Sequence, residues 1–178
     1  EPAFFGAKPK LVLKAGVIHG RGDHMLDHLS HALHSFPIFG LVGMRDRPVR
    51  PVAVADVVRV LAAAVVGDQR LVGRTAAVLG PDELLLGDAV RRVATAVGRS
   101  PRYVRLPIVG QLALAHVAER VMRVPLISIA QVHILAEGVT VPAPSASELP
   151  EDLRPSTPFS IDVIRRGLPP PGGFGRRD

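Results

Sequence analysis

The sequence predicts an α/β protein in which strands and helices alternate around a mostly parallel sheet, and three observations lead to that prediction. Short apolar runs recur along the first two thirds of the chain, and most of them are closed by Gly or Pro. Apolar residues with a helical period follow several of these runs. The chain has 178 residues, 47% of them hydrophobic, which suffices for one domain with a sizeable core. This alternation is typical of α/β units.

The first strand is expected at 11–15, LVLKA, because this apolar run is stopped by glycines that mark a turn. A helix then begins near Asp23 and ends before Pro37, since proline cannot continue a helix. Its apolar face comprises Met25, Leu26, Leu29, Ala32, Leu33 and Phe36. The opposite face, which we expect to be exposed to solvent, carries His24, Asp27, His28, His31 and His34.

A short strand is expected at 51–54, and Asp56 then stands at the start of an apolar helical stretch over 57–66. A carboxylate suits the unpaired amides and the dipole at a helix start, so we interpret Asp56 as structural and not catalytic. The remaining α/β elements are expected as a strand at 75–79, a helix at 86–97 and a strand at 103–106.

After Pro107 the pattern changes, because no further strong strand pattern occurs. Helical periods are found at 108–123 and 127–136, an irregular connection rich in Pro and Ser at 139–158, and a short helix capped by Ser160. We therefore expect three parts: an α/β part at 1–107, a helical lobe at 108–168 and a disordered tail at 169–178.

Composition limits the classes of partner. The formal net charge is +6, but only 4% of the residues are aromatic, and few rings are present to stack on bases, so we expect no nucleic-acid partner. The absence of Cys excludes disulfides, thiolate zinc sites and cysteine nucleophiles. The longest charge-free apolar stretches fall short of the ~18 residues that a spanning helix needs. We expect no transmembrane segment and a cytoplasmic location.

Three sequence blocks occur in order over residues 11–107. They read LVLKAGVIHGRGD from position 11, RPVAVADV from position 50, and GPDE from position 80 followed by GR and VRLP. In this order and spacing they resemble the carboxyl-terminal half of the short-chain dehydrogenase/reductase superfamily. The resemblance is to its extended and atypical members, the NAD-dependent epimerase/dehydratase-like proteins and the NAD(P)H-binding group that includes an accessory subunit of respiratory complex I.

The resemblance implies the last strands of a Rossmann-like, doubly wound parallel sheet, with a small, mainly helical lobe on the substrate side. The superfamily binds NAD or NADP through a Gly-rich turn in its amino-terminal half, and neither that turn nor the Tyr-x-x-x-Lys pair occurs in this sequence. We therefore expect a fragment that is inactive alone. It would bind the cofactor only with the missing amino-terminal half, or with a partner that completes the sheet in its place.

The resemblance also implies site residues. The loop expected to hold the nicotinamide with backbone groups consists of Ala15, Gly16, Val17 and Ile18. His19 follows where a side chain could face a small-molecule substrate; the alternative is a buried structural histidine. Arg47 and Arg50 stand where extended members often bind substrate through an arginine; the alternative is a solvated side chain. No catalytic residue and no metal ligand is assigned.

Two further patterns have a functional and a structural interpretation. His24, His28 and His31 have a spacing that could bind zinc or nickel, but we expect them to be incidental histidines on a solvent-facing surface. Five arginines follow one another without an acid between them, and they are Arg91, Arg92, Arg99, Arg102 and Arg105. We expect a solvated basic face, with an adenosine phosphate, an acidic partner or a peripheral membrane contact as alternatives.

The expected function is therefore the substrate-side half of an NAD(P)-dependent epimerase/dehydratase-like oxidoreductase. One alternative is a non-catalytic NAD(P)H-binding accessory or assembly subunit of a redox complex. Another is a truncated remnant that binds no cofactor. A companion half with both the Gly-rich turn and Tyr-x-x-x-Lys would favour the enzyme, and the turn alone would favour the accessory subunit.

Overall fold

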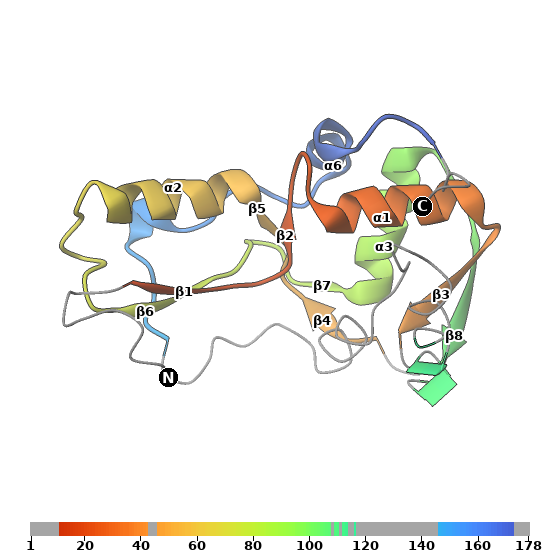
Figure 1. The fold of residues 1–178 in the computed structure, drawn as a ribbon, viewed down its shortest axis with the longest axis horizontal. Helices are drawn as coiled ribbons and strands as arrows, with labels where there is room; N and C mark the ends of the chain where they lie inside the picture. The colour runs from red at the N-terminus through yellow and green to blue at the C-terminus, as the bar shows by residue number, and fades with distance from the viewer. Residues whose placement is uncertain are drawn as a thin grey trace.

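A computed structural model describes residues 11–42, 46–107 and 146–172, together with the isolated positions 109, 110, 112, 113 and 116. Strands and helices alternate over most of this length (Figure 1). In chain order the elements are β1 (Val12–Ala15), β2 (Ile18–His19), α1 (His24–Ser35), β3 (Ile38–Val42), β4 (Pro48–Val49), β5 (Val52–Ala53), α2 (Val54–Val65), β6 (Thr75–Val78), β7 (Leu84–Leu85), α3 (Leu86–Val97), β8 (Arg102–Leu106), the 3-10 turn η1 (Glu151–Leu153) and α6 (Ile161–Gly167).

The strands form four separate pairs. β1 pairs with β6, β2 with β5 and β3 with β8, all in parallel, whereas β4 and β7 are antiparallel. Parallel neighbours need a crossover connection, and α2 lies in the connection between β1 and β6. The predicted α/β class with a mostly parallel arrangement is therefore confirmed.

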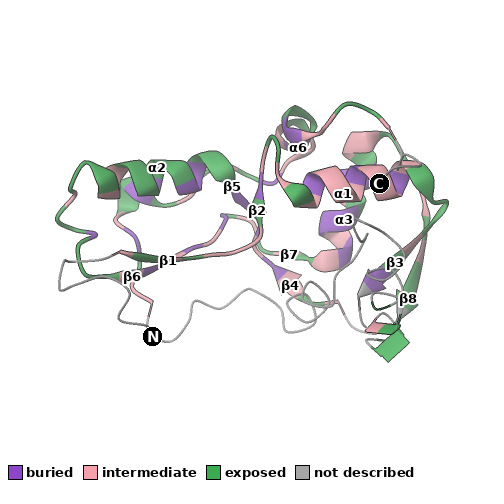
Figure 2. Ribbon diagram, in the orientation of Figure 1, coloured by how far each residue is buried: buried purple, intermediate pink, exposed green. Residues whose placement is uncertain are grey.

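Two hydrophobic clusters divide the molecule into two lobes (Figures 1 and 2). In the sheet lobe, α2 packs on the β1/β6 pair; in the three-helix lobe, α1, α3 and α6 pack together. The sheet lobe buries Val52, Val57, Val60, Leu71, Ala76, Val78, Leu149 and Leu153. The three-helix lobe buries Leu26, Leu33, Val49, Ala89, Val93, Ala94, Phe159 and Ile164.

The helix ends follow from their caps. Asp23 accepts hydrogen bonds from the amides of Leu26 at 2.8 Å and Gly20 at 2.6 Å, so α1 begins directly after it, as predicted. α3 spans the predicted residues and ends at Gly98, whose φ of 76° suits glycine. Ser160 caps α6 through the amide of Val163. These three helices are confirmed.

Several elements differ from the expectation, since the two-residue strands β2, β4 and β7 and the turn η1 were not predicted either. β3 was not predicted, because it is apolar without alternation and Gly40 interrupts it. α2 begins at Val54 instead of residue 57, since no sequence break separates the short β5 from the apolar residues that follow. Asp56 consequently lies within the first turn of α2.

Residues 147–168 return to both lobes. Ser147 forms a parallel bridge with Ala76, and its amide donates to the Thr75 carbonyl at 2.7 Å. Further along, Leu153 enters the core of the sheet lobe and Phe159 that of the three-helix lobe. The irregular connection expected at 139–158 is thus, in its described part, a segment that packs on both lobes.

The division of the chain at residue 108 stays a prediction. Apart from a few helical positions between 109 and 116, the helices expected at 108–123 and 127–136 lie outside the described residues, as do residues 173–178 of the expected tail. In the described ranges no helix is both long enough and apolar enough to cross a bilayer.

Candidate functional site

A pocket of about 280 Å³ lies where β6 ends and the returning chain passes it. Ligands of parallel α/β sheets bind at the carboxyl ends of the strands, which is the position of this pocket. Its walls are formed by Arg50, Ala77, Leu79, Pro81, Ala146, Ser147, Glu148, Leu149, Arg154 and Pro155.

The loop predicted to contact the cofactor adjoins this pocket. The amide of Gly16 donates to the Val78 carbonyl at 3.0 Å, and the Val17 carbonyl accepts from the amide of Val52 at 2.9 Å. A Cβ on Gly16 would lie 2.8 Å from the Arg50 carbonyl oxygen, so only glycine permits this approach. The structure thus brings the loop 15–18 directly against Arg50.

Arg50 is half-buried and oriented by the backbone. Its Nε donates to the Gly80 carbonyl at 3.1 Å, and no ion pair to Arg50 occurs within the described residues. Gly80 is itself required there, because a Cβ would overlap the Pro51 carbonyl. Three chain segments therefore cross at Gly16, Arg50 and Gly80, and the crossing fixes the guanidinium at the pocket wall.

Arg154 is a second cation on this pocket that the sequence analysis did not predict. Its Nη2 lies 3.0 Å from Glu148 Oε2, and both side chains are largely exposed. An exposed ion pair of this kind contributes at most about 1 kcal/mol to stability. An anionic ligand could therefore replace Glu148 as the partner of Arg154 at little cost in free energy. With two guanidinium groups and one carboxylate, the pocket favours a phosphate or carboxylate group.

Asp56 fixes the backbone that carries Arg154. Only 1% of Asp56 is exposed, and its Oδ2 accepts from the amides of Ser156 at 3.2 Å and Thr157 at 3.0 Å. Its Oδ1 lies 3.1 Å from Arg59, whose guanidinium also donates to the Arg154 carbonyl at 2.8 Å. α2 has no side-chain cap. Asp56 thus holds the returning chain instead of the helix start that the sequence suggested.

His19 lies inside the protein. It is 1% exposed, its ring meets that of Phe159 edge to face at 4.8 Å between centroids, and Nε2 has no hydrogen-bond partner. Burial lowers the pKa of His19, and the charges of Asp23 and Asp56 only partly oppose this effect. The predicted contact with substrate stays a prediction, since His19 does not line the pocket at the end of β6.

Arg47 is exposed and does not line the pocket beside Arg50. It is held through its backbone, because the Arg47 carbonyl accepts a hydrogen bond from the amide of Leu86 at 2.8 Å. The crossing that orients Arg50 therefore does not include Arg47, and the substrate-binding role expected of Arg47 stays a prediction.

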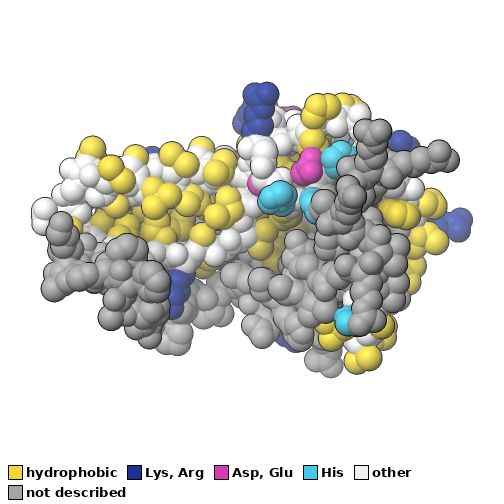
Figure 3. Space-filling model, viewed as in Figure 1, with side chains coloured by type: hydrophobic (Ala, Val, Ile, Leu, Met, Phe, Trp, Pro, Cys, Tyr) yellow, Lys and Arg dark blue, Asp and Glu magenta, His cyan; other side chains and the backbone are white. Residues whose placement is uncertain are grey.

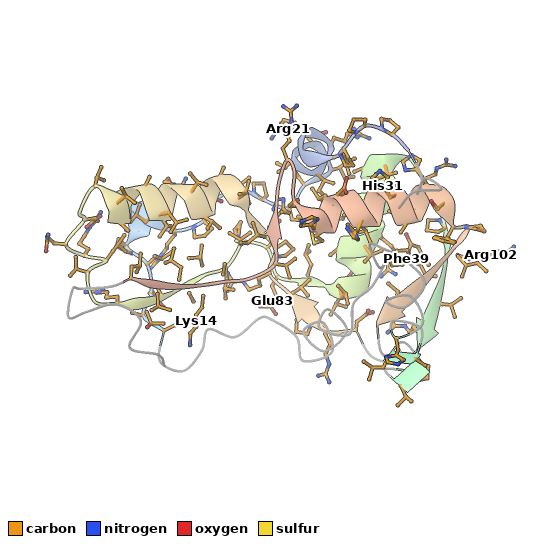
Figure 4. All side chains as sticks on the ribbon, in the orientation of Figure 1. Lys14, Arg21, His31, Phe39, Glu83 and Arg102 are labelled. Carbon is orange, nitrogen blue, oxygen red and sulfur yellow. The ribbon has the colours of Figure 1, made fainter. Side chains whose placement is uncertain are left out.

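The histidine face of α1 is only partly exposed. His24 is exposed, but His28 and His31, the latter visible on α1 in Figure 4, are half-buried. His31 Nδ1 lies 3.7 Å from Asp27 Oδ1. Over the described ranges, no three metal-ligand side chains converge.

Four of the five arginines of the basic run are exposed, and three of the five pair with acids that lie outside the run. Arg91 lies 2.7 Å from Asp88, Arg92 lies 3.8 Å from Asp82, and Arg105 pairs with Asp46. Arg92 also donates to the Phe159 carbonyl at 2.9 Å. Three of the five charges therefore have structural partners, and the alternatives of a nucleotide, an acidic partner or a membrane contact stay predictions.

No family model matches the chain, and no curated protein matches it in sequence. In structure it resembles leucoanthocyanidin reductase from Vitis vinifera in complex with NADPH, with a TM-score of 0.60 and 16% identity over 89% of this chain and 53% of the reductase. An epimerase from Methanothermobacter thermautotrophicus gives a TM-score of 0.57 and 13% identity over 89% of this chain and 42% of the epimerase.

UDP-glucuronic acid 4-epimerase from Bacillus cereus, in complex with UDP-glucuronic acid and NAD, gives a TM-score of 0.54 and 13% identity over 88% of this chain and 43% of the epimerase. At these identities the likeness shows the fold. The described part of the chain therefore has part of the Rossmann-like fold of NAD(P)-dependent epimerases and reductases. The chain spans about half the length of these proteins.

Proposed function

We propose that this chain is the substrate-side half of an NAD(P)-dependent epimerase/dehydratase-like oxidoreductase. The observation that carries the proposal is the pocket with Arg50 and Arg154 at the carboxyl end of β6. It lies where parallel sheets bind ligands, in a fold shared with proteins solved with NAD or NADPH. The predicted nicotinamide loop adjoins it at Gly16.

The residues present fit only one end of the cofactor. The loop 15–18 lies against Arg50 at the pocket wall, with its Gly16 amide and Val17 carbonyl bonded to Val78 and Val52, whereas the sequence contains no Gly-rich turn for a pyrophosphate. The nicotinamide ring supplies hydride chemistry when it is bound. The task of this chain is then to line one side of the ring and to orient the substrate.

Arg50 and Arg154 would bind the anionic group of a small-molecule substrate. The Gly80 carbonyl fixes Arg50 before any ligand arrives, which lowers the entropy cost of binding. Arg154 is held at its backbone by Arg59, and its side chain can exchange Glu148 for the ligand. A planar guanidinium matches phosphate and carboxylate oxygens in pairs, so two of them would fix both position and orientation.

The first test is cofactor binding by the native protein that contains this sequence. It would be purified from its own cells with an antibody against the chain and titrated with NADH and NADPH while nucleotide fluorescence is recorded. Saturable binding of one of them is expected. A native protein that binds neither would overturn the proposal.

The second test is the anion site in that protein. Pyrophosphate binding, followed by calorimetry, is expected to weaken roughly 10- to 100-fold in Arg50→Gln, because a charge-assisted hydrogen bond contributes about 1.5–3 kcal/mol. The matched control is Arg165→Gln, an exposed arginine on α6 that does not line the pocket. Equal pyrophosphate affinity in both variants would remove Arg50 from the site.

A further inference from the structure

A second pocket, of about 450 Å³, lies on the three-helix lobe, where the turn between β2 and α1 meets the end of α6. One wall is formed by the turn and the first residues of α1, and the other by residues 166–170. The pocket shares no residue with the one at the end of β6. Its volume falls in the range of about 300–1,000 Å³ that small-molecule sites occupy.

Each wall contributes an arginine. Arg21 lies in the turn and stands beside α6 (Figure 4), and Arg166 lies in the last turn of α6. Both residues are exposed, and within the described ranges neither forms an ion pair or a side-chain hydrogen bond. The neighbouring Arg165, in contrast, lies 3.7 Å from Asp162. The two guanidinium groups of the pocket therefore keep their N–H donors for a ligand.

The carboxylates of the pocket already face donors of the protein. Asp23 accepts from the amide of Leu26 through Oδ1 and from the amide of Gly20 through Oδ2. Asp27 Oδ1 lies 3.7 Å from His31 Nδ1. The hydrogen-bonding capacity left in the pocket is therefore mainly that of donors, which favours an anionic ligand rich in acceptors.

The two walls meet in direct contact at Gly167, which is buried. A Cβ at this position would lie 3.0 Å from Leu26 Cδ1 and 3.1 Å from the carbonyl carbon of Gly20, so α6 ends directly against the turn. Ile164 also anchors α6 in the core of the three-helix lobe. The backbone that carries both arginines is thus in place before a ligand arrives, which lowers the entropy cost of binding.

The wall beyond Arg166 is apolar, because Leu168, Pro169 and Pro170 line the same cavity. In the space-filling view, a basic side chain projects at the upper rim of the molecule, with hydrophobic side chains close to it (Figure 3). A ligand that fills this pocket therefore combines an anionic group with an organic body.

We propose that this second pocket binds the phosphate monoester of a small organic molecule, with the phosphate on Arg21 and Arg166 and the organic part against residues 168–170. A phosphate monoester has three terminal oxygens, which two guanidinium groups can share. A carboxylate has only two oxygens, and a single guanidinium fork matches both. The site is separate from the proposed function, since neither the nicotinamide loop nor Arg50 lines this pocket.

The test is a calorimetric titration of the native protein carrying Arg50→Gln, which removes the anion site at the end of β6, with phenyl phosphate. Saturable binding is expected, at least about 10-fold tighter than that of benzoate or of inorganic phosphate. Benzoate lacks the third oxygen, and inorganic phosphate lacks the ring. Equal affinity for benzoate would make the pocket a carboxylate site, and equal affinity for inorganic phosphate would show that the apolar wall is not used. Either result would overturn the proposal.

Variants of the two arginines locate the binding. In the Arg50→Gln background, Arg21→Gln and Arg166→Gln are each expected to weaken phenyl phosphate binding roughly 10- to 100-fold, because each removes a charge-assisted hydrogen bond. The matched control is Arg165→Gln, which replaces the exposed neighbour of Arg166 outside the pocket and should leave the affinity unchanged. An equal loss in Arg165→Gln and Arg166→Gln would mean diffuse attraction to a basic surface and would contradict the site.

The two anion sites are also told apart by the background itself. If Arg50→Gln alone abolishes phenyl phosphate binding, the ester binds only at the end of β6 and the proposal is wrong. Should Arg50→Gln not fold, the comparison of Arg166→Gln with Arg165→Gln in the parent protein gives the same decision. Nicotinamide binding by the native protein does not enter this test, so its outcome is independent of the oxidoreductase role.

Discussion

Asp56 shows how much one buried carboxylate contributes to the returning chain. It joins two backbone amides and a guanidinium while almost excluded from water. The amides of Ser156 and Thr157 would lose their acceptor without it, and donors left unsatisfied away from water are costly.

We predict that Asp56→Ala lowers the free energy of unfolding by about 1–3 kcal/mol for each of the two half-buried amides that lose their acceptor. Urea unfolding followed by circular dichroism measures it. The control Asp162→Ala removes an 81% exposed carboxylate and should change stability by no more than about 0.5 kcal/mol. Similar losses in both variants would contradict the role of Asp56.

His19 predicts a pH dependence of stability. Its pKa is lowered in the folded protein, so the unfolded chain binds the proton more readily. The contribution of His19 to the free energy of unfolding is therefore complete above the pKa of the unfolded chain, near 6.5. This contribution is lost as the pH falls below that value, by up to ~1.4 kcal/mol per pH unit.

His19→Phe keeps an aromatic ring against Phe159 and removes the unpartnered Nε2. The loss of stability between pH 7.5 and pH 5.5, measured by urea unfolding, should be smaller in this variant than in the parent chain. A pH dependence identical to that of the parent would show that other groups cause it.

At the scale of elements, the returning chain joins the two lobes through Phe159. Its amide donates to Asp82 at 2.8 Å, its carbonyl accepts from Arg92, and its ring is 1% exposed. Asp82 stands before α3 and Arg92 lies within it, so the segment is tied to that helix at both backbone groups.

Phe159→Ala is expected to destabilise the fold by about 3–5 kcal/mol, because it leaves a cavity in the three-helix lobe. Phe36→Ala, at a ring that is 46% exposed, is the matched control and should cost far less. Thermal unfolding monitored by circular dichroism compares them. Equal transition temperatures would mean that Phe159 is not part of the core.

The helices could be predicted from sequence because their signals are local. Asp23, Gly98 and Ser160 each stand within a few residues of the helix end that they determine. β3 could not be predicted from sequence, since its five residues resemble any apolar run and its partner β8 lies some 60 residues away in the chain.

The candidate site could also be predicted from the sequence only in part. The loop 15–18 and Arg50 were found from a resemblance in sequence, and the structure brings them together. Arg154 was missed because it lies in an irregular segment, placed by Asp56 through hydrogen bonds that span 100 and 101 residues. No pattern of neighbouring residues indicates a contact between positions so far apart in the sequence.

At the scale of the whole molecule, two lobes share one chain, and among the described residues they differ in how completely each core is surrounded. The three-helix lobe surrounds its own core, whereas the sheet lobe is a two-stranded pair with an exposed helix face. An isolated pair of strands is marginal in water, so the sheet lobe should gain most from a partner.

We predict that the 178-residue chain alone shows no saturable binding of NADH or NADPH in isothermal calorimetry. The physical reason is that the chain contributes backbone groups at the nicotinamide end but no Gly-rich turn for the pyrophosphate. The native protein is the positive control. Micromolar binding by the isolated chain would contradict its role as one half of a nucleotide-binding protein.

The bridge at Ser147 also limits how the molecule can aggregate. A fibre of stacked sheets requires every subunit to offer two free edges, one to accept a strand and one to extend the stack. Here Ser147 bridges β6 at Ala76 and its amide bonds to the outward carbonyl of Thr75, so the β6 edge of this sheet is already partly used. A strand that adds on the β6 side would have to displace this bridge, which disfavours open-ended growth through this sheet.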